Sequence, residues 1–225
     1  MAGGLCAVPA AAHAHITVAS GPGFAGTTQE IGFGVAHGCA GADTIKVRIE
    51  IPAAVTSVRP MRSDFGTVSV EKDATGAITA AVWQKADADV LDADIAYYKL
   101  VIRLKVPNQP FTTVFFPAHQ TCRAADGTVS TTDWVALPTD PATDGGAGEP
   151  APALTVLPPR APGWNTFTVP AAIPDLGVFF SDALIVWKGT AAYSANMATQ
   201  AQIAATAGVT PLSSLAAGDQ ISVRY

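Results

Sequence analysis

The sequence is poor in charged residues. Asp, Glu, Lys and Arg make up 14% of its 225 residues, and apolar residues make up 49%. An ordinary soluble domain is about 25% charged. This composition excludes an intrinsically disordered chain, which would be rich in charge and poor in apolar residues. The net charge of -5 also excludes the basic surface that sequence-independent nucleic-acid binding requires, so we expect no nucleic-acid partner.

The sequence also lacks long apolar runs and the common catalytic motifs. No apolar run approaches the roughly 18 residues of a transmembrane helix, so we expect no transmembrane segment. G-x-S-x-G, P-loop and H-E-x-x-H motifs are absent. Residues 21–26 match the spacing of a dinucleotide fingerprint, but residues 28–35 have the pattern of a strand, and that fingerprint must open a helix. No catalytic acid, base or nucleophile stands out, and we therefore do not expect an enzyme.

The apolar residues present alternate in the manner of strands. Segments 44–51 and 97–106 place apolar side chains on one face and polar side chains on the other, which is typical of an antiparallel sheet packed on a core. Shorter candidates lie at 15–19, 29–36, 65–71, 77–83, 111–117 and 133–137. This pattern predicts a β-sandwich.

The composition changes after residue 138. Residues 139–163 are dominated by Pro and Gly and predict a linker without a strand or helix. Residues 164–225 hold three strand candidates and one helix, which should begin near Asn196 and stop at Gly208. We expect an all-β sandwich over 15–138, followed by a small α+β domain of unknown role.

The first residues resemble the end of an export signal. Residues 2–12 are small and apolar and lead into an A-x-A cleavage pattern. Cleavage after Ala12 or after Ala14 fits this pattern, so residues 1–14 are predicted to be the remnant of a signal peptide. The protein is then periplasmic or secreted, and Cys6 leaves with the leader.

Two cysteines remain, Cys39 and Cys122. In an oxidising compartment this pair predicts one disulfide. Closing a loop of about 83 residues stabilises a fold by roughly 4.5 kcal/mol on the chain-entropy model. His37 and His119 lie close to the cysteines in sequence, so a Cys2His2 zinc site is the alternative, although the tight cysteine pairs of zinc motifs are absent.

Export would give His15 an unusual chemistry. Cleavage after Ala14 leaves His15 with a free α-amine, and this amine and the imidazole Nδ1 can chelate one metal ion together. Both groups lose their protons at little cost near neutral pH, and two such nitrogens completed by a carboxylate suit Cu(II). Cleavage after Ala12 would instead place His13 first and His15 third, which makes a different and flexible copper-binding terminus.

The chain resembles the YcnI-like copper-binding domain family over about 15–138. The resemblance rests on the ordered segments HITV (15–18), GTTQE (26–30), KVRIEIP (46–52), GTV (127–129) and DW (133–134). It implies a cupredoxin-like or immunoglobulin-like β-sandwich that binds Cu(II) through a mono-histidine brace. Carried over by position, the metal residues would be His15, the carboxylate Glu30 and a covering Trp134.

These expectations lead to a periplasmic or secreted protein that holds copper. Its partners would be copper itself and other copper-trafficking proteins of the cell envelope, in a buffering or chaperone role. One alternative is a copper enzyme that oxidises polysaccharides, which would need a second histidine, His37 or His119, in the brace. Another is a metal-free interaction sandwich at the cell surface.

Overall fold

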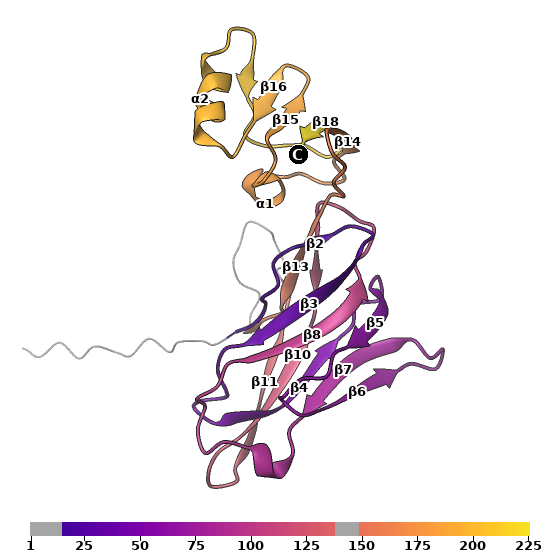
Figure 1. The fold of residues 1–225 in the computed structure, drawn as a ribbon, viewed down its shortest axis with the longest axis vertical. Coiled ribbons are helices and arrows are strands. Elements are labelled where there is room, and N and C mark those ends of the chain that lie inside the picture. Colours follow the sequence, from indigo (N-terminus) through magenta and orange to yellow (C-terminus); the bar gives the residue numbers. More distant parts are fainter. Residues whose placement is uncertain (1–14, 138–148) are drawn as a thin grey trace, which may run out of the picture.

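The predicted β-sandwich is confirmed. The computed structural model describes residues 15–137 and 149–225, and it is mostly β with three sheets in its larger part (Figure 1). The first sheet has the order β1 (Ile16–Val18), β3 (Thr28–Val35), β8 (Tyr98–Lys105), β5 (Thr56–Pro60). The second has the order β12 (Glu149–Pro150), β11 (Val129–Ala136), β10 (Ala118–Arg123), β4 (Asp43–Glu50), β7 (Ile78–Gln84), β6 (Thr67–Lys72). The third has the order β2 (Gly23–Phe24), β13 (Ala153–Leu157), β9 (Thr112–Phe115).

The alternating segments form the strands that build the core. Strand β8 pairs antiparallel with β3, and β4 lies between β10 and β7. One buried cluster joins all three sheets, and its largest members include Trp83, Phe33 and Phe116. A short 3-10 helix, η1 (Asp87–Asp89), lies in the loop between β7 and β8. Among the described residues, no helix is both long enough and apolar enough to span a membrane.

The linker predicted over 139–163 requires correction, because part of it belongs to the sandwich. Strand β13 pairs antiparallel with β9 and parallel with β2, and its Leu154 and Val156 are fully buried in the core. Pro152, just before β13, has no amide to donate and is used as an acceptor: its carbonyl accepts a hydrogen bond of 2.8 Å from the amide of Phe116. Residues 138–148 lie outside the described part of the chain.

A buried ion pair at the ends of β4 and β7 in the six-stranded sheet is linked to the four-stranded sheet through the hydroxyl of Tyr98 on β8. Lys85 Nζ lies 2.5 Å from Asp43 Oδ2 and 2.7 Å from the Tyr98 hydroxyl, which itself donates to Asp43 Oδ1 at 2.6 Å. Asp43 is fully buried, and its Oδ2 also accepts from the amide of Leu91. Burial, together with the hydrogen bond to Asp43, raises the pKa of Tyr98, so its hydroxyl stays a proton donor.

We predict that Lys85→Met lowers the free energy of unfolding by about 3–5 kcal/mol, because it leaves the Asp43 carboxylate buried without its cation. Chemical denaturation at neutral pH measures the loss. The exposed Lys99→Met serves as the control and should be nearly neutral. A Lys85→Met protein as stable as the wild type would show that Asp43 does not need this partner.

The C-terminal unit has its own sheet and core. Its sheet has the order β14 (Trp164–Thr168), β18 (Gln220–Arg224), β15 (Ile185–Lys188), β16 (Ala191–Tyr193), β17 (Thr210–Pro211). Its helices are α1 (Gly177–Phe180) and α2 (Met197–Ala205). Helix α2 starts as expected, with the Asn196 side chain accepting from the amides of Ala198 and Thr199. The unit lies at one end of the sandwich, beyond β2 and β13 (Figure 1).

Two side chains join this unit to the sandwich. Phe111, in the loop between β8 and β9, is 5% exposed and belongs to the core of the C-terminal unit, where its ring lies 5.7 Å from that of Phe167. The Arg160 guanidinium lies 4.5 Å from the ring of Phe24 in the sandwich and 4.8 Å from that of Tyr225, the last residue. The α+β unit is therefore packed on the sandwich and not merely tethered to it.

We predict that Phe111→Ala destabilises the C-terminal unit by about 3–5 kcal/mol, the usual loss for removing a buried Phe ring. Limited proteolysis should then cut within 164–225 while the sandwich stays intact. Val178→Ala, at a half-exposed position of the same unit, is the matched control. Equal protease resistance of the two variants would contradict the packing role of Phe111.

Candidate functional site

The candidate site brings together one residue from the beginning of the sandwich sequence and two from near the end of that sequence. His15 directly precedes β1, Trp134 lies on β11, and Glu149 begins β12. The imidazole and indole rings are 5.4 Å apart between centroids and tilted by 53°. His15 Nε2 lies 3.9 Å from Glu149 Oε2. Two of the three predicted metal residues, His15 and Trp134, are therefore brought together.

The pairing of β11 explains why Trp134 and Glu149 meet at this place. On one side β11 runs antiparallel to β10, with Trp134 opposite Ala118. On the other side it runs parallel to β12, with Trp134 opposite Glu149. Residues opposite each other across a strand pair carry their side chains on the same face. The sheet thus fixes the carboxylate beside the indole.

Glu30 does not belong to this site, and its prediction as the carboxylate ligand is corrected here. Strand β1 pairs with the far end of β3, where Ile16 lies opposite Val35. Glu30 is five residues away along β3, opposite Arg103 of β8, which corresponds to about 16 Å at strand rise. The segment GTTQE (26–30), which carries part of the family resemblance, thus leads into strand β3 and not to the site. The acidic side chain beside His15 is that of Glu149.

The three side chains differ in burial. Trp134 is 4% exposed, whereas the side chains of His15 and Glu149 are 41% and 28% exposed. A buried indole forms the floor of the site, and the imidazole and carboxylate remain reachable from solvent. An imidazole nitrogen and a carboxylate oxygen are donors that Cu(II) accepts, and an indole ring can attract a cation through its π face.

The predicted disulfide is confirmed, and it excludes the Cys2His2 zinc alternative. Cys39 and Cys122 are bonded, with their Cα atoms 5.7 Å apart. The two nearby histidines have other partners. His37 Nδ1 lies 3.6 Å from Asp94 Oδ2, and His119 contacts carboxylates on both ring nitrogens.

Ordinary side-chain metal clusters are absent from the described residues. Within 15–137 and 149–225, no group of three or more His, Cys, Asp and Glu side chains is arranged to hold a metal ion. The predicted leader, with His13 and both cleavage positions, lies outside the described residues.

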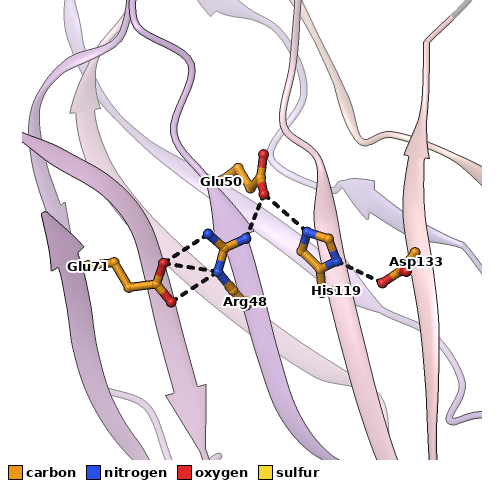
Figure 2. Close-up of polar contacts among 5 residues, drawn as sticks. All are labelled: Arg48, Glu50, Glu71, His119 and Asp133. Carbon is orange, nitrogen blue, oxygen red and sulfur yellow. Dashed lines mark hydrogen bonds and ion pairs between the residues drawn. The ribbon is translucent and has the colours of Figure 1, made fainter. Parts of the chain in front are cut away.

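A second polar cluster lies on the outer face of the six-stranded sheet (Figure 2). Its residues form one chain of contacts across four strands: Glu71, Arg48, Glu50, His119 and Asp133. His119 Nδ1 lies 2.7 Å from Asp133 Oδ1, and Nε2 lies 3.2 Å from Glu50 Oε1. Because the two carboxylates face opposite sides of the ring, they do not converge on a common point as metal ligands would.

Arg48 organises the acidic end of this cluster. Its guanidinium binds Glu71 through Nε and Nη2 and Glu50 through Nη1, at 2.6–3.1 Å. These hydrogen bonds lower the pKa of both carboxyls. A carboxyl with a lowered pKa stabilises the fold above its unfolded-state value, and this contribution disappears as the pH falls through the folded-state value.

We predict that Arg48→Met raises the pKa of Glu50 and Glu71 toward ordinary values, since the guanidinium that stabilises their charged forms is gone. NMR titration of the side-chain carboxyl carbons measures both. The stability difference from the wild type should be present near neutral pH and shrink in acid, as both carboxyls become protonated. Unchanged titration of Glu71, whose pKa is lowered mainly by its hydrogen bonds from Arg48, would contradict this account.

Two residues of the site region escaped the sequence analysis, Glu149 and Gln120. Glu149 lies on the two-residue strand β12 in the Pro/Gly-rich segment, and so short a strand has no alternation to mark it. Gln120 lies on β10, whose sequence AHQTCR contains few strand-forming residues although it is a central strand. In the structure Ala118, Gln120 and Cys122 are the buried positions of that strand, and their spacing of two residues is the signal that could have indicated it.

The comparisons with known proteins now place the chain in a family. A family model described as a domain of unknown function (DUF1775) matches residues 15–156. The chain belongs to the DUF1775 family. This is the family to which the YcnI-like resemblance points. The match ends within β13, so it includes β12 and most of β13, while the C-terminal unit lies outside it.

The chain also resembles solved structures, one of them described by its fold. It is the crystal structure of an uncharacterized protein from Nocardia farcinica, described as having an immunoglobulin-like fold. The two sequences are 25% identical, the alignment covers 63% of this chain and 97% of the other, and the TM-score is 0.49. No curated protein matches the chain.

Proposed function

We propose that this protein binds one Cu(II) ion at His15 and holds it for buffering or delivery outside the cytoplasm. The observation that carries the proposal is the convergence of Trp134 on β11, Glu149 on β12 and His15, the residue before β1. The proposal requires that export processing leaves His15 as the first residue. Its α-amine is then the further donor that the side chains alone do not provide.

The donor set fits the chemistry of Cu(II). The α-amine and imidazole Nδ1 of His15 would form a chelate, and the carboxylate of Glu149 would add an anionic oxygen that offsets part of the ion's charge. In this structure it is Nε2 that faces Glu149, so chelation through Nδ1 requires the half-exposed ring to rotate. Trp134 has no lone pair to donate from its N–H, and it would limit access to the ion from the side of the core.

The surroundings favour holding the ion over catalysis with it. A copper brace that oxidises polysaccharides would need a second histidine. Both ring nitrogens of His119 contact carboxylates on the outer face of the sheet, and His37 lies beside Asp94. The supply and destination of copper would involve other proteins of the cell envelope.

We predict that a chain beginning at His15 binds one equivalent of Cu(II), and that Glu149→Gln weakens binding by at least about tenfold because the anionic oxygen is lost. Isothermal titration against a competing chelator measures the affinity. Glu30→Gln, which removes a carboxylate on the same sandwich but far from His15, is the matched control and should bind as the wild type does.

The free amine can be tested separately. A Gly-Ser-Gly-Ser extension before His15 converts the α-amine into an amide and moves the new amine away from the imidazole, so tight binding should be lost. Equal affinity with and without the extension would overturn the chelate. A correctly processed chain that binds no Cu(II) would leave the metal-free interaction sandwich as the better explanation.

A further inference from the structure

Gln120 is a buried amide next to the candidate site, and all its hydrogen-bonding groups are used. The residue is 1% exposed. Its Oε1 accepts a hydrogen bond of 3.1 Å from the indole Nε1 of Trp134. Its Nε2 donates to the carbonyl of His37 at 2.6 Å and to Thr44 Oγ1 at 2.8 Å.

The partners fix the orientation of this amide. An indole N–H can only donate and a main-chain carbonyl can only accept. The side-chain oxygen must therefore face Trp134, and the NH2 group must face His37. Because burial makes any unpaired polar group costly, rotation of the indole or displacement of the His37 carbonyl would each leave a group of Gln120 without its partner.

These contacts close a ring around the site. The His37 carbonyl lies just beyond Val35, which pairs with Ile16, the residue after His15. The His15 ring packs on Trp134, and the Trp134 indole N–H donates a hydrogen bond to Gln120. Gln120 in turn donates a hydrogen bond to the carbonyl of His37. The Cys39–Cys122 disulfide ties the same two segments together, two residues further along each of them.

We propose that Gln120 is a positioning residue of the copper site. It directs the indole N–H of Trp134 away from His15, so that the ring and not the N–H is presented to the metal ligand. It also holds the end of β3 on which β1, and with it His15, is aligned. This inference rests on the proposed function. It gives an uncharged amide the role of a group that holds a metal-site side chain in its orientation through a hydrogen bond.

The test compares Gln120→Met, which keeps the length of the side chain but loses its polar groups, with Gln109→Met on the surface. In the absence of copper, the Trp134 indole N–H resonance should move upfield and exchange faster with solvent in Gln120→Met only. Cu(II) affinity of the chain beginning at His15 should fall about 10–100-fold in the same variant. Gln120→Glu, whose buried carboxyl should stay protonated and so keep both an acceptor for Trp134 and a donor for the His37 carbonyl, should restore the indole resonance and serves if Gln120→Met does not fold.

The outcomes separate this inference from the proposed function. An unchanged indole resonance in Gln120→Met, or a shifted resonance with unchanged Cu(II) affinity, overturns the positioning role while the copper site stands. A wild-type chain that starts at His15 and binds no Cu(II) overturns the proposed function and the positioning role at a metal site together.

Discussion

The arrangement of the site depends on the place of β11 between β10 and β12. This strand carries Trp134 into the core, receives Glu149 from one neighbour and contacts the buried Gln120 of the other. A shift of one residue in either pairing would move the indole or the carboxylate to the opposite face of the sheet. The buried indole, anchored by a hydrogen bond to a buried amide, makes such a shift unfavourable. Burial of one aromatic residue thereby fixes the position of two polar ones.

The sequence predicts much of the sandwich, because alternation is a local property. Segments 44–51 and 97–106 alternate cleanly and become the central strands β4 and β8. Strand β13 was missed because prolines and glycines around it dominate the composition, although Leu154 and Val156 alternate inside it. Strand β10 was missed because it carries polar side chains on both of its faces, and their partners come from distant strands.

The candidate site was predictable only in part. His15 could be singled out from the cleavage pattern before it, and Trp134 from the family resemblance. The carboxylate could not be chosen correctly, because nothing in the sequence around Glu30 or Glu149 shows which strand end each lies beside in the fold. The register of β1 on β3 and of β12 on β11 decides between them, and register is set by packing across the whole core.

The site is assembled from the two ends of the sandwich, since His15 precedes its first strand and Glu149 opens its twelfth. A chain that is still emerging from the ribosome or from a translocation channel carries His15 long before Glu149 follows. Such a chain has the histidine without its acidic partner and without the strand pairing that aligns the indole. Completion of the site is therefore coupled to completion of the domain, and a ligand that needs all three groups distinguishes finished molecules from unfinished ones.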